Sequence, residues 1–355
     1  MKRQLSSNLL KWYDSEKISL PWRNSANAYH IFLSEVMLQQ TQVNTVIPYF
    51  QRWIQAFPTI KDVAQAPLDH ILKQWEGLGY YSRARNFHKS CQIICEKFSG
   101  EIPNNIEAIS SLPGIGPYSA AAVMSIAFHH PLPAVDANVL RIVSRLHLLS
   151  APVSTLTGKV ASLLSEIIPK NRAGDFNQAM MDLGRVICTN RNPKCDICPL
   201  NICCKAYAKN LTHAFPKKNA KPLKPVYKIA VGVIWRDGDI LISRRKEEGL
   251  LGGLWEFPGG KLLPGETAEN CIVREVQEEL GVVVQTTEFI KQIKHSYTHF
   301  SIIMDAYHCK YISGEPRCYQ CSDWRWIEPE DISMLPFPKA NHKLFQHAFA
   351  KEELC

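Results

Sequence analysis

The sequence contains no run of eighteen apolar residues, the shortest stretch from which a membrane-spanning helix is expected. Its first eight residues also lack the apolar core of a secretory signal peptide. Neither sign of charge dominates, because the formal net charge of +8 is modest for 355 residues. Since 46% of the residues are hydrophobic, the chain can bury sizeable cores and is not expected to be disordered. We expect a cytoplasmic, multi-domain protein without a membrane partner.

One short loop holds four of the twelve cysteines and no histidine. These are Cys188, Cys195, Cys198 and Cys204, in a C-x6-C-x2-C-x5-C spacing. An all-thiolate set is typical of zinc or an iron–sulfur cluster. Zinc loops usually carry two C-x2-C pairs, so the long first gap favours a 4Fe–4S cluster. A further C-x2-C pair, Cys318 and Cys321, has no partner pair, and we interpret it as incidental.

The sequence changes character near residue 215. Residues 1–214 predict an all-α domain, with proline and glycine at the joins between helices. Residues 215–226 alternate lysine with proline and predict a solvated linker. Residues 227–350 predict an α+β domain that opens with an apolar strand over 229–235, a turn over 236–239 and a second strand. The expected helices of the first domain cover residues 28–44, 62–76, 82–98, 105–111, 117–129, 137–147, 155–168 and 175–187.

Three features of the helical domain suggest chemistry on nucleic acid. The run Leu112–Tyr118 carries Gly114 and Gly116 and predicts a helix-hairpin-helix turn, whose backbone N–H groups would face a phosphate. Glu35 is a carboxylate inside an apolar helix, where desolvation would raise its pKa. Asp136 interrupts an apolar stretch at a helix start, where it serves as an N-cap held ionised and fixed in orientation. An acid and a carboxylate are the pair that cleavage of a glycosidic bond requires.

These residues together resemble the MutY family of adenine DNA glycosylases. The resemblance runs over nearly the whole chain. Endonuclease III shares the expected fold and cluster, but its catalytic lysine position is Tyr118 here, so Schiff-base chemistry at this position is unavailable. The resemblance rests on the cysteine loop, the hairpin, and residues 20–23 (LPWR), 34–41 (SEVMLQQT), 77–83 (GLGYYSR), 135–139 (VDANV) and 177–184 (NQAMMDLG).

The resemblance implies a role for each matched residue. Glu35 would protonate N7 of adenine and then activate water, and Asp136 would stabilise the sugar cation. Tyr118 and Asn138 would support that site. The residues implied to contact DNA or a base are Arg23, Gln40, Leu78, Tyr80, Gly114, Gly116 and Gln178, with Gln40, Leu78 and Tyr80 inserting at the lesion.

The second domain resembles a MutT-like Nudix domain. Tyr297, Thr298 and His299 stand where the MutY family has a Phe-Ser-His motif that reads 8-oxoguanine. Residues 260–282 fit a complete Nudix box, and Glu275, Glu278 and Glu279 fall at i, i+3 and i+4 on one helical face. Such a cluster suits a hard cation, so a Mg²⁺ site is expected, and hydrolysis of a nucleoside triphosphate is a further hypothesis.

We therefore expect a monofunctional, monomeric base-excision enzyme of the bacterial cytosol or nucleoid. It would remove adenine opposite 8-oxoguanine or guanine in double-stranded DNA and leave an abasic site. Three alternatives remain open: an endonuclease III-like enzyme for oxidised pyrimidines, a nucleotide hydrolase tethered to DNA by its helical domain, and a non-catalytic, cluster-bearing DNA-binding protein.

Overall fold

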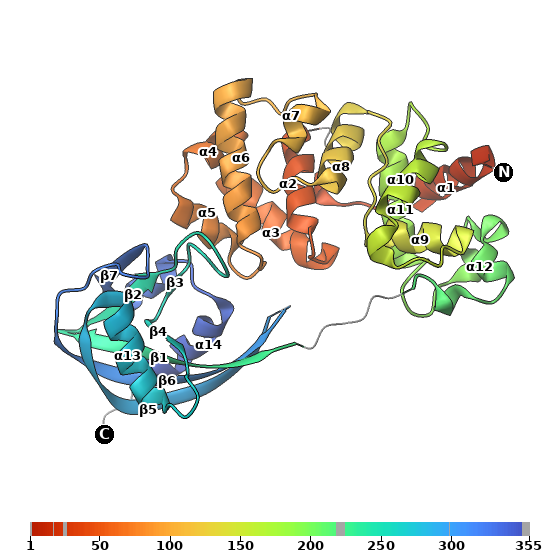
Figure 1. Cartoon of the computed structure of the whole chain (residues 1–355). Helices are drawn as coiled ribbons and strands as arrows, with labels where there is room; N and C mark the ends of the chain where they lie inside the picture. The colour runs from red at the N-terminus through yellow and green to blue at the C-terminus, as the bar shows by residue number, and fades with distance from the viewer. Residues whose placement is uncertain (1, 17, 24–26, 218–223, 298, 350–355) are drawn as a thin grey trace. The chain divides into compact units, whose positions relative to one another are not determined.

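A computed structural model describes residues 2–16, 18–23, 27–217, 224–297 and 299–349 (Figure 1). The chain divides into two compact units. The first contains the described residues up to 65 and those from 86 to 217. The second combines residues 66–85 with the described residues from 224 onward. A helical domain thus precedes a sheet-containing domain in the sequence, but one helical segment, 66–85, belongs to the second unit.

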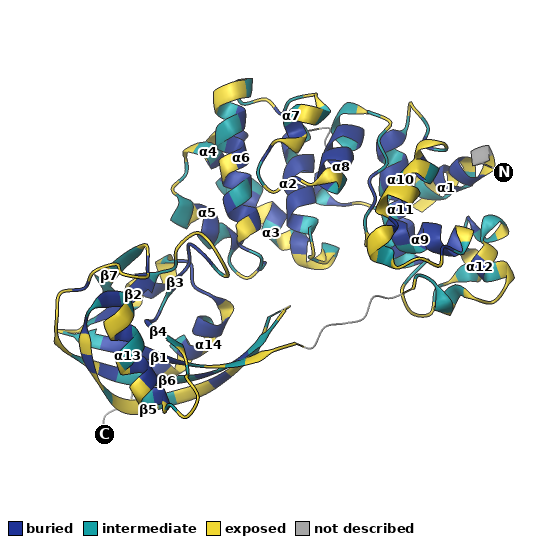
Figure 2. Cartoon of the chain, viewed as in Figure 1, coloured by how far each residue is buried: buried dark blue, intermediate teal, exposed yellow. Residues whose placement is uncertain are grey.

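The first unit is helical, and the apolar sides of α1, α9, α10 and α11 face one core (Figure 2). Leu9 of α1, Val143 of α9 and Phe176 of α11 are among its buried members. Its α-helices are α1 (Lys2–Glu16), α2 (Ala28–Leu38), α3 (Val43–Ala56), α4 (Ile60–Gln65), α6 (Ser82–Phe98), which runs on from the second unit, α7 (Ile106–Ser110), α8 (Pro117–Phe128), α9 (Ala137–His147), α10 (Thr157–Ser165), α11 (Ala173–Val186) and α12 (Lys205–Ala208).

Two of the helices expected from the sequence are wrong in extent. The helix expected over 28–44 ends at Leu38, and α3, which was not expected, begins at Val43. Gln40 between them has a φ of 57°, a left-handed value that a helix does not permit. The helix expected over 62–76 is α4 and α5 (Leu68–Trp75), separated at Pro67. Proline restricts the residue before it to extended conformations and so ends a helix.

The second unit contains a seven-stranded mixed sheet covered on both faces. Its main order is β3-β2-β1-β6-β5, with β4 paired to β1 and β7 to β2. Strands β1 and β6 are parallel, and the other pairs are antiparallel. The strands are β1 (Val226–Arg236), β2 (Asp239–Arg244), β3 (Trp255–Glu256), β4 (Gly259–Lys261), β5 (Val283–Ser296), β6 (Ser301–Ser313) and β7 (Asp323–Ile327).

The apolar run of β1 reflects this double cover. Val231 and Val233 pack in a core that includes Leu344 of α14 (Lys339–Ala348). Ala230 and Ile234 point to the other face, where they join Ile272 of α13 (Ala268–Leu280). A strand buried on both faces reads as continuously hydrophobic, as it does here. The turn to β2 is at Asp237 and Gly238, whose φ angles of 53° and 96° are those of a tight hairpin.

Candidate active site

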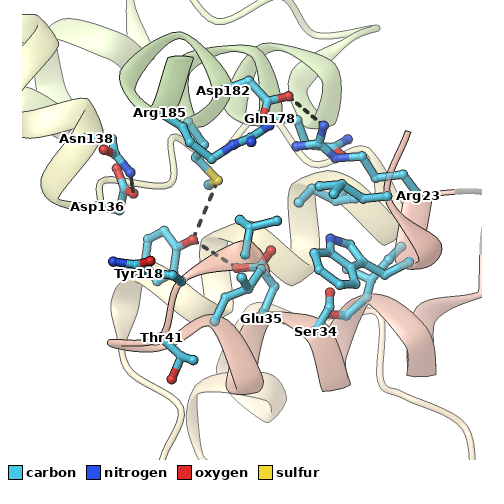
Figure 3. A pocket seen from close by; sticks show the side chains of 18 of the residues that line it. Arg23, Ser34, Glu35, Thr41, Tyr118, Asp136, Asn138, Gln178, Asp182 and Arg185 are labelled. Carbon is cyan, nitrogen blue, oxygen red and sulfur yellow. Dashed lines mark hydrogen bonds and ion pairs between the residues drawn. The ribbon is translucent and has the colours of Figure 1, made fainter. Parts of the chain in front are cut away.

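A pocket of about 750 Å³ opens in the first unit between helices α2, α8, α9 and α11. Its lining includes six residues expected from the sequence: Arg23, Glu35, Tyr118, Asp136, Asn138 and Gln178 (Figure 3). Residues more than a hundred positions apart in the chain therefore meet in one cavity. Side chains from separate sequence motifs thus line a single pocket.

Glu35 lies on α2 and is only 4% exposed. The hydroxyl of Tyr118, at the start of α8, donates a hydrogen bond to Glu35 Oε2 over 2.9 Å. Burial raises the pKa of Glu35 to about 7, even though the hydrogen bond from Tyr118 opposes the rise. The carboxyl is therefore protonated in a substantial fraction of molecules at neutral pH, as a general acid must be.

Asp136 is the N-cap of α9, as its position in the sequence predicts. Its Oδ1 accepts from the backbone N–H of Val139 over 2.7 Å, and its Oδ2 accepts from Asn138 Nδ2 over 2.8 Å. Burial raises the pKa of Asp136, while these two hydrogen bonds and the charge of Arg141 act in the opposite direction. The carboxylate is thus fixed in orientation, but burial opposes the ionised state that a capping role alone would favour.

Asn138 is itself held by a second residue. Arg141, one turn further along α9, donates from Nη2 to Asn138 Oδ1 over 2.8 Å and to the carbonyl of Gly184 over 2.7 Å. Its Nε donates to the carbonyl of Cys188 over 2.7 Å. Arg141 therefore connects the Asn138–Asp136 pair to the first cysteine of the loop. Sequence analysis missed this residue.

A Gly184→Ala substitution is expected to disturb the same pair. A Cβ at position 184 would lie 2.5 Å from Asn138 Cβ, a distance at which one group must move. We expect a loss of about 1–3 kcal/mol of stability and an activity of this pocket lowered by roughly tenfold or more. Thermal unfolding and single-turnover kinetics measure the two effects.

Gly158→Ala is the matched control for this substitution. Gly158 is also helical, but a Cβ there meets nothing within 4 Å. This variant should retain its rate and stability. Equal effects of the two substitutions would show that the close approach of Gly184 to Asn138 is unimportant.

Three ion-paired side chains line the pocket, and the sequence predicted only one of them, Arg23. Arg23 Nη1 lies 2.5 Å from Asp182 Oδ2, and Arg185 Nη2 lies 3.2 Å from Asp182 Oδ1. Asp182 is 3% exposed, so its charge is compensated by both arginines. Asp182 and Arg185 were not predicted as site residues. They were detectable, because they share one face of α11 with Gln178 and Met181 by helical spacing.

The helix-hairpin-helix turn joins α7 to α8 as expected. Gly114 has a φ of 75°, and a Cβ there would lie 2.9 Å from Asn86 Cβ, so glycine is required for both conformation and space. Gly116 is the N-cap of α8, and no side chain caps that helix. Both glycines are exposed, and neither lines the pocket. The turn therefore offers first-turn N–H groups to a ligand outside the pocket.

The other expected DNA-contacting residues do not line the pocket. Gln40 is exposed in the turn between α2 and α3. Leu78 and Tyr80 are in the 66–85 segment, and Leu78 is 6% exposed, so insertion into DNA would require it to leave a packed position. The rings of Tyr80 and His299 lie 6.3 Å apart within the second unit. Tyr297 stacks on Phe300 at 4.7 Å, and Thr298 lies outside the described residues.

The four loop cysteines line one small cavity with Arg145. Arg145 is 2% exposed and donates to Cys188 Sγ over 3.3 Å and to the carbonyl of Thr189 over 2.7 Å. Because Cys188, Cys195, Cys198 and Cys204 line the same small cavity, their thiols lie near one another. Within the part of the chain described here, no three His, Cys, Asp or Glu side chains are arranged to hold a single metal ion.

Three Nudix-box carboxylates, one before α13 and two on it, are paired with an arginine of that helix. Arg274 lies 2.7 Å from Glu266, 2.9 Å from Glu275 and 3.4 Å from Glu278. Burial, with the charges of Glu256 and Glu275, raises the pKa of Glu279 to about 8.

None of the described helices combines the length and the hydrophobicity that a membrane span requires.

Comparisons with known proteins agree with this architecture. Residues 33–170 match the HhH-GPD superfamily of base excision DNA repair proteins, and residues 230–347 match the NUDIX domain. The chain is similar to a thermostable thymine-DNA glycosylase (29% identity, TM-score 0.54, 59% of this chain and 97% of that one). A non-covalent endonuclease III–DNA complex gives 27% identity and a TM-score of 0.51 over 59% of this chain and 98% of that one.

Curated relatives extend the match to both domains. The adenine DNA glycosylase of Mus musculus is 34% identical over 397 residues, covering 96% of this chain and 77% of the relative. That of Buchnera aphidicola subsp. Schizaphis graminum is 37% identical over 300 residues, covering 84% of this chain and 85% of the relative. With this similarity over most of both proteins, the chain belongs to the adenine DNA glycosylase family.

Proposed function

We propose that this chain hydrolyses the N-glycosidic bond of adenine paired with 8-oxoguanine or guanine in DNA and leaves an abasic site. The observation that carries the proposal is the pairing, in one pocket, of Glu35, a buried acid, with Asp136, a capped carboxylate. Glu35 would donate a proton to N7 of the extruded adenine, which turns the base into a better leaving group. Asp136 would then face the positive charge that develops on the sugar.

The pocket favours hydrolysis without a lyase step. Among the described residues that line it, none is a lysine, so no neutral amine is available to attack the sugar carbon. The two arginines, Arg23 and Arg185, are ion-paired with Asp182, and a guanidinium does not act as an amine nucleophile. After base loss Glu35, then ionised, would accept a proton from the attacking water.

The test is single-turnover base release from three duplexes, in which adenine is opposite 8-oxoguanine, guanine or thymine. We expect fast release from the first, slower release from the second and none from the third, with strand cleavage visible only after alkali. EDTA keeps any activity of the second domain silent. No release from any duplex would reject the proposal, and cleavage without alkali would reject its monofunctional part.

The rate of release should depend on pH through Glu35. Burial raises the pKa of Glu35 to about 7, so the acid form is lost as pH rises through that value. We expect the single-turnover rate to fall about tenfold per pH unit above about 8. Because the pKa of Glu35 is 4.5 in the unfolded chain and about 7 in the folded one, the unfolded chain binds fewer protons between these two pH values. The contribution of Glu35 to the free energy of unfolding therefore falls as pH rises from 4.5 to 7. A flat rate profile from pH 6 to 9 would contradict this assignment.

We further propose that Cys188, Cys195, Cys198 and Cys204 hold a 4Fe–4S cluster. Four thiolates around one cavity, with a buried arginine at one sulfur to offset their charge, suit such a group. A zinc loop usually carries two C-x2-C pairs, whereas this loop carries one. Iron and sulfide analysis with visible absorbance tests the proposal, and a colourless, zinc-loaded protein would refute it.

A second candidate activity is Mg²⁺-dependent hydrolysis of a nucleoside triphosphate by the Nudix domain. It is favoured by the complete Nudix box and by the position of Glu275, whose carboxylate lies where a Cβ on Gly260 would be. Bound Mg²⁺ would neutralise the phosphates and the cluster of carboxylates. Release of pyrophosphate from 8-oxo-dGTP, lost in Glu278→Gln, would support this activity. The absence of turnover with any oxidised nucleotide would refute it.

A further inference from the structure

The C-x2-C pair of the second unit was interpreted from the sequence as incidental, but the structure gives its two thiols different surroundings within one loop. Cys318 and Cys321 lie in the loop between β6 and β7, and their side chains are close enough to interact. Cys318 is exposed to solvent, whereas Cys321 is 8% exposed. One sulfur is therefore reachable by a reagent, and the other is shielded.

The loop that carries the pair is fixed to the end of α13. The N–H groups of Tyr319 and Arg317 donate to the carbonyls of Glu279 and Leu280 over 3.0 and 2.9 Å. The Tyr319 ring also lies against Gly281, because a Cβ added there would be 2.9 Å from its edge. These contacts hold Cys318 and Cys321 in register at the C-terminal end of the helix that bears the Nudix glutamates.

We propose that Cys318 and Cys321 form a reversible redox site that closes to an intramolecular disulfide. The chemistry is exchange with a low-molecular-weight disulfide. The Cys318 thiolate attacks one sulfur of the reagent and releases one thiolate, giving a mixed disulfide on Cys318. Cys321 then loses its proton and attacks Cys318 Sγ, which releases the second thiolate. The net result is one internal S–S bond, two reduced small thiols and no other oxidant.

The order of attack follows from exposure. Cys318 is the accessible sulfur, so it meets the reagent first. Burial raises the pKa of Cys321 to about 12, so this sulfur stays protonated until Cys318 has reacted. Two other cysteines of the second unit, Cys271 and Cys309, are fully buried and should remain unreacted.

The test uses the whole cluster-bearing chain treated with oxidised glutathione, then alkylated and analysed by peptide mass spectrometry. We expect a 318–321 disulfide that reduced glutathione reverses, with Cys271 and Cys309 alkylated as free thiols. Visible absorbance during treatment shows whether the cysteine loop of the first unit is unaffected, so the result does not depend on that site.

Two variants separate the steps. Cys321→Ser should accumulate the glutathione mixed disulfide at Cys318, because the resolving sulfur is gone. Cys318→Ser should take up at least tenfold less glutathione, because Cys321 is shielded. If the unsubstituted chain stops at the mixed disulfide, or if neither sulfur reacts while the protein stays folded, the proposal is wrong.

Discussion

A Glu35→Gln variant is expected to bind DNA containing adenine opposite 8-oxoguanine but to release adenine roughly 10²–10⁴ times more slowly. Glutamine has the shape of the protonated acid and retains an oxygen that can accept the hydrogen bond from Tyr118. It cannot donate a proton to the leaving base or accept one from water. The loss should therefore appear in the single-turnover rate constant and not in DNA affinity, which a binding titration at the same pH measures.

The same variant should be more stable than the unsubstituted chain at pH 8. Glu35 is 4% exposed, and its pKa rises from 4.5 to about 7 on folding, so ionisation at pH 8 costs the folded state up to roughly 3 kcal/mol. Glutamine removes that cost. Thermal unfolding at pH 8 should show a higher midpoint, and the difference should shrink towards pH 5. A variant that is inactive but less stable at pH 8 would mean that inactivity reflects damage to the pocket.

The sequence predicted elements well wherever local signals agreed with tertiary packing. The helix expected over 137–147 is α9, because Asp136 both caps it and precedes an amphipathic run. The helix expected over 28–44 failed at the α2–α3 turn for the opposite reason. Gln39, Gln40 and Gln42 are ordinary helix residues, and nothing local predicts that Gln40 takes a left-handed conformation. Packing of α3 on α2 determines that turn, and packing is not visible in one sequence.

The candidate site shows the same contrast between residues with a local sequence signal and residues that only the fold brings together. Glu35 was identifiable because a carboxylate in an apolar helix is chemically conspicuous. Arg141 was not, since an arginine in an amphipathic helix is usually solvated, and only the fold brings its guanidinium to Asn138 and Cys188. The grouping of residues 66–85 with the sheet-bearing unit was equally invisible, because it depends on contacts between distant parts of the chain. Cys318 and Cys321 were interpreted as incidental because a missing partner pair argues against zinc, but that absence does not argue against a dithiol.

The second large effect is expected from Asp136→Asn, which should slow adenine release by roughly 10²–10³-fold at neutral pH. Asparagine is as good an N-cap as aspartate, so its side-chain oxygen can still accept from the Val139 N–H. The substitution therefore removes the negative charge that faces the sugar cation but keeps the start of α9. Stability should change by less than about 1 kcal/mol, and single-turnover kinetics alongside thermal unfolding separate the two quantities.

Arg141→Gln tests whether orientation of that charge matters as well as its presence. Arg141 does not line the pocket: it contacts Asp136 through Asn138, and its charge also lowers the pKa of Asp136. If a fixed carboxylate is required, this variant should lose rate, and its rate should still fall at acidic pH, where Asp136 becomes protonated. In Asp136→Asn that fall at acidic pH should disappear. A full rate in Arg141→Gln would mean that the Val139 N–H alone orients Asp136, and a full rate in Asp136→Asn would remove the carboxylate from the mechanism.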